Sequence, residues 1–416
     1  METPAGRSAA PIAARERIST LDALRGFALL GILIMNMPSF NMPIYHAVAP
    51  DQWTMWWDRA ARAVTDVLFA GKFNGMFSML LAVGFTIQLQ RLSERAPEKA
   101  VAIYLRRLAW LFIFGLVHSC IWAGDVLHMY AILGLLLLAF RNLSDRTIIG
   151  LIICSLAYPA IEGVILLKIT TPEDTQRAVS FMKGLVAGDF AAVESGSFWV
   201  AVRQSLRTWS ATYVSPMSWY VVPRVYITLL TTALLGLLLG RRRFFQNVAA
   251  YLPLVSRVQW WALGAGVAMG AVYAFWSATV EQRQEPTVFR LFAVLCFRLS
   301  RLALMAFYVC VIIRAMHSDQ WQQRLQPFVS MGRMPLTNYL LQTLIGMVIF
   351  AGWGLGYYGQ VGPALGVVIS LAIFFVIQAP LSRLWLSRFQ MGPMEYLWRV
   401  LTYGRLPSIR KATQSA

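Results

Sequence analysis

The sequence places a histidine and an aspartate at the facing ends of two consecutive apolar segments. His118 closes segment 103–122, and Asp125 opens segment 124–140. A carboxylate that orients and charges an imidazole is the arrangement that general-base catalysis requires. The same residues also have ordinary structural roles, as an N-cap for Asp125 and an interfacial position for His118. A metal site that adds His128 is a weaker interpretation, because the spacing fixes no ligand geometry, and we expect no bound metal.

Two arginines lie in the middle of the apolar segment 288–313. Arg298 and Arg301 are one helical turn apart and too far from either end of the segment to reach water cheaply. Such a pair must meet a carboxylate, a cluster of carbonyl groups, a lipid headgroup or a phosphate-bearing ligand. Glu162, in another apolar segment, is a candidate protein partner. The pair is therefore a candidate site for an anionic group.

The first apolar segment, 20–38, carries polar residues on one face. Asp22 and Arg25 are one helical turn apart, and Asn36 follows about three turns further on. The charged pair is either a structural ion pair at the membrane interface or part of a site for an anionic group on the cytoplasmic side. The loop after this segment contains His46, which is a second candidate base.

The remaining polar candidates stand at the ends of apolar segments. Lys72 and Asn74 lie in a stretch with two glycines, 69–75, which predicts a broken helix start. Lys72 could instead snorkel to the membrane surface. In the ninth segment, Pro335 suits a first helical turn. Polar residues around this proline complete the candidate substrate-binding set: Arg333, Asn338 and Gln342.

The amino-acid composition indicates which kind of secondary structure holds these candidate site residues. Of the 416 residues, 58% are hydrophobic and 13% are charged, against about 45–50% and about 25% in soluble proteins. A soluble enzyme, a disordered chain and a fibrous protein are thereby excluded. Since a spanning helix needs about 20 apolar residues, we predict an all-α, polytopic membrane bundle of about ten transmembrane helices. The predicted spans are 20–38, 67–90, 103–122, 124–140, 147–167, 219–240, 259–279, 288–313, 334–352 and 362–385.

The net charge of +18, from 37 basic and 19 acidic residues, follows a pattern along the chain. Of the basic residues, 23 lie near the termini or in alternate loops, whereas the loops 121–127 and 353–361 have none. With an even number of spans, the positive-inside rule predicts that both termini are cytoplasmic. Because the excess charge reports orientation, we expect membrane lipids as partners, and no nucleic acid.

We predict one transmembrane domain, 20–400, between a cytoplasmic leader, 1–19, and a cytoplasmic tail, 401–416. The longest connection, 168–218, then faces outward. Its amphipathic pattern fits either a helix on the outer membrane surface or a lid over an outward-facing site.

Several motifs, taken in order, resemble the YeiB-like family of bacterial inner-membrane proteins, known as domain of unknown function 418. The resemblance extends from about residue 17 to about residue 404. Two of its motifs, 332–342 and 392–399, are specific. The motifs are Leu21-Asp-Ala-Leu-Arg-Gly26 with Gly31 and Asn36, Lys72-Phe73 with Phe77-Ser78, His118 with Gly124-Asp125, Gly332-Arg-Met-Pro-Leu-Thr-Asn-Tyr-Leu-Leu-Gln342, and Gly392-Pro-Met-Glu-Tyr-Leu-Trp-Arg399.

The opening motif, with Asp22, Arg25 and Gly26, is also similar to the transmembrane acyltransferase superfamily. That likeness implies transfer of an acyl group from a cytoplasmic donor, acyl-CoA or a similar co-substrate, to an envelope glycan or lipid on the other side. No bound cofactor is implied. By the same likeness, donor-side groups would include Arg25, Arg298 and Arg301, and the base would be His118 or His46. In the glucosamine acetyltransferases the catalytic histidine lies in the first outer loop, a place that His46 fits only loosely.

Two other interpretations remain open at this point. A transporter or lipid flippase would use Arg298 and Arg301 to bind an anionic substrate, and Asp66, Lys72 or Glu162 to couple protons. Transporters often contain inverted repeats, and none is evident here. A non-catalytic membrane scaffold would need the same polar residues only for folding.

Overall fold

The apolar segments fold into helices in the computed structural model, which describes residues 18–45, 53–169, 171–215, 218–279, 288–404, 406 and 408–411. The described residues form no β-strand, so the predicted all-α class is confirmed. The longer helices are α1 (Ser19–Asn41), α2 (Trp56–Leu68), α3 (Lys72–Arg95), α4 (Ala100–Ser119), α5 (Leu127–Phe140), α6 (Asp145–Ile169), α7 (Pro172–Glu194), α8 (Phe198–Tyr213), α9 (Ser218–Arg241), α10 (Val248–Thr279), α11 (Val288–Ala315), α14 (Pro335–Phe350), α15 (Pro363–Ala372), α16 (Ala379–Arg388) and α17 (Pro393–Tyr403). Short helices are α12 (Asp319–Arg324) and α13 (Gln326–Gly332), and a π-helical turn, 373–378, joins α15 to α16.

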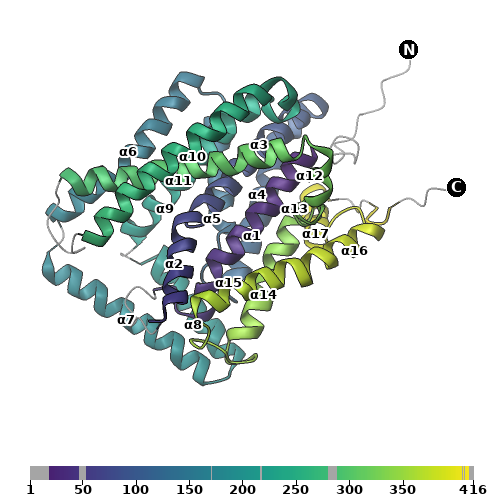
Figure 1. The fold of residues 1–416 in the computed structure, drawn as a ribbon. Coiled ribbons are helices and arrows are strands. Elements are labelled where there is room, and N and C mark those ends of the chain that lie inside the picture. Colours follow the sequence, from purple (N-terminus) through teal and green to yellow (C-terminus); the bar gives the residue numbers. More distant parts are fainter. Residues whose placement is uncertain are drawn as a thin grey trace, which may run out of the picture.

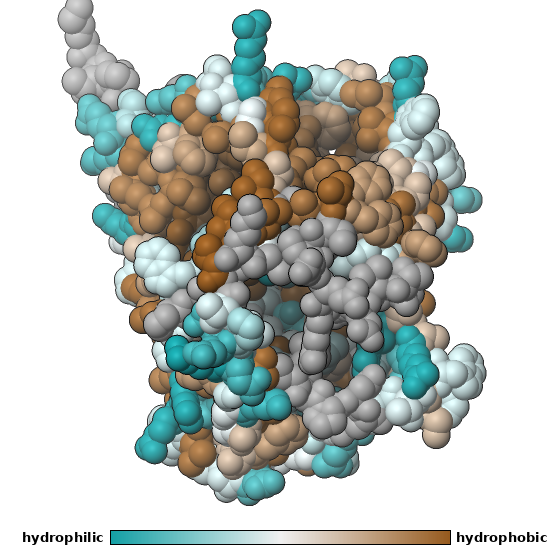
Figure 2. Space-filling model, turned by 90° about the vertical axis from the view of Figure 1, so that its left-hand side faces the viewer, coloured by the Kyte–Doolittle hydropathy of each residue, from teal (hydrophilic) through white to brown (hydrophobic). Residues whose placement is uncertain are grey.

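Every predicted span coincides with a helix. Among the described residues, eight helical stretches are long and apolar enough to cross a membrane, including Trp56–Arg95 and Pro363–Arg388, each built from consecutive elements. The other two predicted spans correspond to the shorter apolar helices α5 and α14. The protein is therefore a polytopic membrane bundle. Figure 2 shows a broad apolar band across one face, with hydrophilic side chains above and below it.

The helix ends gather at two opposite ends of the bundle (Figure 1). We call the end where α5 and α9 finish the basic end. There the Arg241 guanidinium donates hydrogen bonds to three carbonyl oxygens at the end of α5, those of Phe140, Arg141 and Leu143. A cation is favoured there, because unpaired carbonyls give a helix C-terminus partial negative charge. The start of α1 and helix α17 lie at the same end (Figure 1). At the far end, the Asn41 amide donates to Val361 O at 2.6 Å and ties α1 to the loop before α15.

Helix α1 crosses α13 at a point where only glycine fits. A Cβ at Gly26 would overlap the carbonyl group of Phe328, and a Cβ at Gly332 would overlap that of Asp22. Two sequence motifs that lie some 300 residues apart therefore meet, backbone on backbone. This contact fixes where the charged start of α1 lies relative to the start of α14.

The second predicted span begins with a break in the helix, as the glycines in 69–75 predicted. Helix α2 ends at Leu68, and α3 begins at Lys72 after Gly71, which has a left-handed φ of 71°. That conformation favours glycine. The added helix α2 packs beside α15, and the buried Asp58 carboxylate accepts a hydrogen bond from Ala364 N at 3.0 Å. Asp58 thus caps α15 at its N-terminus.

The long connection, 168–218, forms two helices, where one amphipathic helix was the simpler expectation. Helix α7 starts with a capping box in which Thr171 and Asp174 bond reciprocally. Helix α8 docks on the bundle, since the Ser205 hydroxyl donates to Ser119 O at the end of α4 at 2.8 Å. The pair of helices covers the far end of α4 and α5.

Candidate functional site

The predicted contact between His118 and Asp125 is present, and a second histidine joins it. Asp125 is fully buried. Its Oδ1 lies 2.7 Å from His118 Nδ1, and its Oδ2 lies 2.8 Å from His128 Nδ1 and accepts from the His128 backbone N–H at 3.2 Å. The helices approach this closely because α4 has Gly115 there, where a Cβ would overlap the main chain of His128. We call these three side chains the His–Asp–His cluster.

The hydrogen bonds assign a tautomer to each imidazole. A carboxylate only accepts, so each Nδ1 carries a proton, and in the neutral imidazole the lone pair is then on Nε2. Both Nε2 atoms are buried, and neither has a hydrogen-bond partner in the described part of the chain. Two basic nitrogens are thus oriented by one carboxylate and left available. Within the same residues, no group of His, Cys, Asp or Glu side chains is placed to hold a metal ion.

Aromatic rings enclose the two imidazoles on different sides. The His118 ring lies 5.2 Å from the Tyr339 ring and 6.2 Å from the Trp122 ring. The His128 ring lies 4.6 Å from that of Tyr213 on α8. His118 therefore faces α14, and His128 faces the helices that cover the far end.

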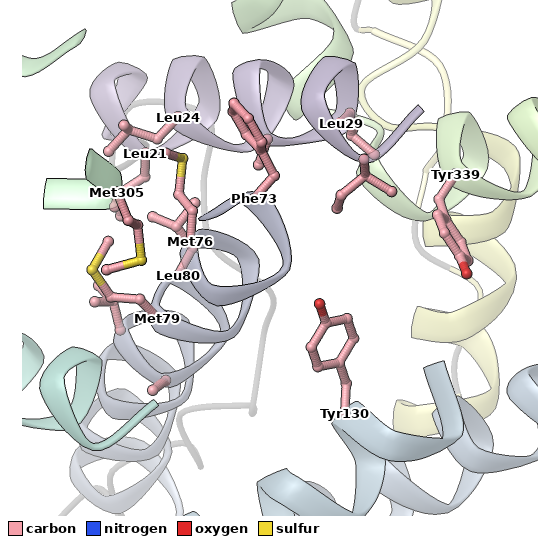
Figure 3. Packing of buried hydrophobic residues seen from close by; sticks show 14 of the residues in the cluster. Leu21, Leu24, Leu29, Phe73, Met76, Met79, Leu80, Tyr130, Met305 and Tyr339 are labelled. Atoms are coloured by element: carbon pink, nitrogen blue, oxygen red, sulfur yellow. The ribbon is translucent and has the colours of Figure 1, made fainter. Parts of the chain in front are cut away.

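A cavity of about 300 Å³ runs from the basic end toward the cluster. At the basic end it is lined by five arginines and two carboxylates: Arg25, Arg91, Arg107, Arg333, Arg399, Asp22 and Glu395. Its middle is apolar, with Leu80 and Leu108 among the lining residues, and its inner part is lined by Val126, Tyr130 and Tyr339. Figure 3 shows Tyr130 and Tyr339 reaching from separate helices with their hydroxyls directed into the space between them.

The inner end of the cavity touches the cluster through Tyr339. Its hydroxyl accepts from Val126 N, the residue after Asp125, at 3.4 Å. Its ring packs on His118. The cavity thus ends one side chain away from the imidazole, and Tyr339 separates the two.

A smaller cavity, of about 80 Å³, approaches from the far end. Its walls include Trp122 and Ala123, which belong to the turn between His118 and Asp125, together with residues of α7 and α8. The Asp189 carboxylate lines it and accepts from Gln204 Nε2 at 2.8 Å and from the Thr208 hydroxyl at 3.3 Å. Burial raises the pKa of Asp189 to about 6, although both hydrogen bonds oppose the shift.

The raised pKa of Asp189 gives a pH dependence with a definite sign. In the unfolded chain this carboxyl ionises near pH 3.8, whereas in the fold it stays protonated up to about 6. Stability is therefore lost as pH rises through this window. We expect Asp189→Asn, which keeps an acceptor oxygen, to raise the melting temperature in detergent at pH 7.5 and to leave it nearly unchanged at pH 4. An equal effect of the substitution at both pH values would contradict this assignment.

The other predicted site residues lie in several different parts of the structure. Arg25 donates to Asp22 at 3.0 Å, and both line the large cavity together with Arg333. Asn338 and Gln342 instead join a buried amide network with Gln378, which ties α14 to the π-helical turn. Asn36 is half-buried on α1 and lines none of the three cavities. His46 lies outside the described residues.

The remaining two predicted pairs do not line the large cavity. Lys72 Nζ donates to Asp66 O at 3.2 Å, while Asn74 contributes its backbone carbonyl to the Tyr130 hydroxyl at 3.3 Å. Arg298 and Arg301 line a separate cavity of about 40 Å³. The structure therefore does not bring them together with Arg25. Glu162, their candidate partner, pairs with Arg224 at 3.0 Å.

Several residues at the site were missed or given another role by sequence reasoning. His128 was weighed only as a metal ligand, although its spacing of three from Asp125 already placed both on one helical face. Glu395 stands four residues before Arg399, a spacing that predicts a surface ion pair, and in the fold it is half-buried and accepts from Leu336 N at 2.6 Å and Thr337 N at 3.1 Å. The cavity residues Arg91, Arg107, Tyr130 and Tyr339 and the pocket residue Asp189 gave no local signal.

Comparison with known proteins assigns the family. Residues 239–405 match the family described as "Protein of unknown function (DUF418)". The chain is also 30% identical to the "Uncharacterized protein YxaH" of Bacillus subtilis (strain 168), over 97% of this chain and 98% of that protein. The chain is a member of the DUF418 family.

A second DUF418-like relative confirms the resemblance read from the motifs. The "Uncharacterized protein YeiB" of Escherichia coli (strain K12) is 28% identical over 96% of this chain and 100% of that protein. These names carry no activity, so the more distant likeness to acyltransferases is not supported by them. An argument about the reaction of this DUF418 protein must come from the site itself.

Proposed function

We propose that this DUF418 protein is a membrane acyltransferase, which moves an acyl group from a thioester donor bound at the basic end to an acceptor bound at the far end. One observation carries the proposal. An arginine-lined cavity with apolar walls ends at Tyr339, whose ring packs on an imidazole with its Nδ1 held by a buried carboxylate and its Nε2 unpartnered in the described part of the chain.

The large cavity suits an acyl-CoA. Arginines bind phosphate groups through forked, charge-assisted hydrogen bonds, and the cavity has an excess of arginines over carboxylates at the basic end. An acyl chain is favoured in the apolar middle, where Leu80, Leu108 and Leu111 form the walls. This arrangement directs the thioester carbonyl toward Tyr130 and Tyr339, and so toward His118.

The proposed acyl transfer needs no catalytic group other than side chains of this protein. His118 Nε2 removes the proton from the acceptor hydroxyl or amine as that atom attacks the thioester carbonyl, and Asp125 stabilises the imidazolium. Collapse of the tetrahedral intermediate breaks the carbon–sulfur bond. The imidazolium returns its proton to the leaving thiolate, which gives the acylated acceptor and the free thiol.

The acceptor is proposed to approach from the far end. The small cavity there offers the Asp189 carboxylate and the Gln204 amide beside the turn that links His118 to Asp125. Hydrogen-bonding groups of this kind suit a polyhydroxylated acceptor such as an envelope glycan or a lipid headgroup. In the same proposal the basic end faces the cytoplasm of a bacterial inner membrane, as the positive-inside rule predicts, and α7 and α8 form the lid.

The test is release of free thiol from acetyl-CoA by the purified protein in proteoliposomes, with and without glucosamine as a probe acceptor, followed by mass spectrometry of the acceptor. We expect thiol release that depends on the protein, and an acetylated product on the side opposite the donor. Uptake of an anion with no covalent product would instead favour the transporter interpretation.

A substitution among the arginines that line the large cavity separates donor binding from the chemical step. We expect Arg91→Gln to raise KM for acetyl-CoA about tenfold, because a charge-assisted contact to phosphate contributes about 1.5–3 kcal/mol, and to leave kcat within about twofold. The matched control is Arg257→Gln, an exposed residue of α10 that does not line the cavity. An unchanged KM in Arg91→Gln would remove this arginine from the donor site.

A further inference from the structure

A second group of cations lies within the bundle, away from the proposed acyl-transfer site. It combines Arg224 on α9, Arg298 and Arg301 on α11, and Lys72 at the start of α3. Two carboxylates share the region: Glu162, paired with Arg224 at 3.0 Å, and Asp66. Cations therefore exceed carboxylates. We call these four basic residues the inner basic cluster.

The cluster lies deep along the membrane-crossing helices. Thr228, whose hydroxyl accepts from Arg298, is about 20 Å along α9 from its last residue at 1.5 Å per residue. A hydrocarbon core is about 30 Å thick. Excess positive charge at such a depth is costly unless an anion balances it.

The surroundings of Arg301 show most clearly that the inner basic cluster lacks an anionic partner. In the part of the chain that the structure describes, its guanidinium has no hydrogen-bond acceptor and no carboxylate partner. Its neighbours include the Phe297 ring, 5.3 Å away, and Gly71, where a Cβ would overlap the guanidinium. Glycine at this position, which also has a positive φ, lets the arginine lie against the main chain. The guanidinium is therefore held in place, and its donors remain available.

The space in front of Arg301 fits a small anionic group. A cavity of about 40 Å³ is bounded by Arg298, Arg301 and Gly71, and by hydroxyl-bearing residues of α6 and α9: Ser155, Thr228, Thr231 and Thr232. The N-terminus of α3 also borders it at Gly75, and the positive end of that helix dipole adds to the field of the arginines. Guanidinium forks and hydroxyl groups are the donors that phosphate oxygens accept from.

We propose that the inner basic cluster binds the phosphate group of a membrane lipid, which enters between α6 and α9 from the bilayer. The cavity holds a headgroup phosphate but no whole lipid. Arg224 belongs to the cluster although it does not line the cavity. Its side chain is 48% exposed, and Ile161 and Val225, next to Glu162 and Arg224 in the chain, are exposed as well, so the cluster extends to the lipid-facing surface. The acyl tails remain in the hydrocarbon, while the phosphate replaces the carboxylate that Arg301 lacks. This site is separate from the proposed acyl-transfer site and does not depend on it.

The experiment measures binding of dihexanoyl phosphatidylglycerol to the full-length protein in detergent, by native mass spectrometry and by the shift in melting temperature. We expect Arg301→Gln to weaken binding about tenfold or more, as loss of a charge-assisted phosphate contact implies. Arg301→Lys keeps the charge without the fork, and we expect an intermediate affinity. The exposed Arg257→Gln is the control, with unchanged binding.

The outcomes separate the sources of phosphate. Saturable lipid binding that inorganic phosphate displaces poorly, and that falls from wild type through Arg301→Lys to Arg301→Gln, supports the proposal. Equal lipid affinity in Arg301→Gln and wild type overturns it. Stabilisation by inorganic phosphate alone, with none from the lipid, would show a site for a free anion and would equally overturn the lipid assignment.

Discussion

Replacing His118 with alanine is expected to lower the rate of acyl transfer by about 10²- to 10⁴-fold, the usual contribution of a positioned general base. The substitution removes the imidazole nearest the large cavity and leaves the arginines that would bind the donor in place. We therefore expect kcat to fall while KM for acetyl-CoA stays within about twofold. Thiol release and acceptor acylation by the purified variant in proteoliposomes provide the measurement.

A matched control separates chemistry from folding. His317→Ala removes a histidine of the same protein at the basic end, where its ring contacts Ile313 O at 2.8 Å and lines none of the three cavities. That variant should keep full turnover. Asp125→Asn should lose nearly as much as His118→Ala, because the amide no longer holds the imidazole in its Nδ1–H tautomer.

The double variant gives the sharper result. Residues that act as one unit are non-additive, so His118→Ala combined with Asp125→Asn should be no slower than His118→Ala alone. If His118→Ala retains wild-type turnover in a well-folded preparation, His118 is not the base. Loss of turnover in His317→Ala to the same degree would show that the assay reports folding.

The sequence predicted those contacts that depend on residues close together in the chain. Hydropathy located the helices because each apolar stretch must satisfy its own backbone in a membrane. Because only a few residues connect α4 to α5, His118 and Asp125 had to lie close together, and in the structure His118 Nδ1 is 2.7 Å from Asp125 Oδ1. The break before α3 could be predicted because glycine readily adopts the left-handed backbone conformation that the structure has at Gly71.

Contacts that depend on which helices pack against each other could not be predicted from the sequence. Arg25 and Arg301 each looked like a donor-side group, but α1 and α11 direct them into different cavities. Glu395 likewise looked like one half of an i,i+4 pair with Arg399. In the fold it reaches α14 and satisfies the Leu336 and Thr337 N–H groups at its first turn. Side-chain type and spacing were correct in these cases, and the partner was supplied by tertiary packing.

The glycine contact between α1 and α13 joins two motifs of the family, and its loss is expected to be severe. A Cβ at Gly332 would overlap the carbonyl of Asp22, and the obstructing atoms are backbone. Overpacking costs about 1–3 kcal/mol where side chains can adjust, and more where they cannot. We therefore expect Gly332→Ala to lower the melting temperature and the yield of monodisperse protein sharply, with parallel loss of donor binding because Asp22 and Arg25 shift together.

A control for this prediction exists within the same chain. Gly264 lies exposed in α10, and a Cβ there would meet no atom within 4 Å. Alanine favours a helix over glycine by about 0.8–1.0 kcal/mol, so Gly264→Ala should be neutral or slightly stabilising in the same thermal assay in detergent. Since the two substitutions are chemically identical, a difference between them measures the close approach of α1 and α13. Equal melting temperatures for Gly332→Ala and Gly264→Ala would mean that this crossing does not hold the charged start of α1 in place, and the position of Asp22 and Arg25 at the large cavity would then need another explanation.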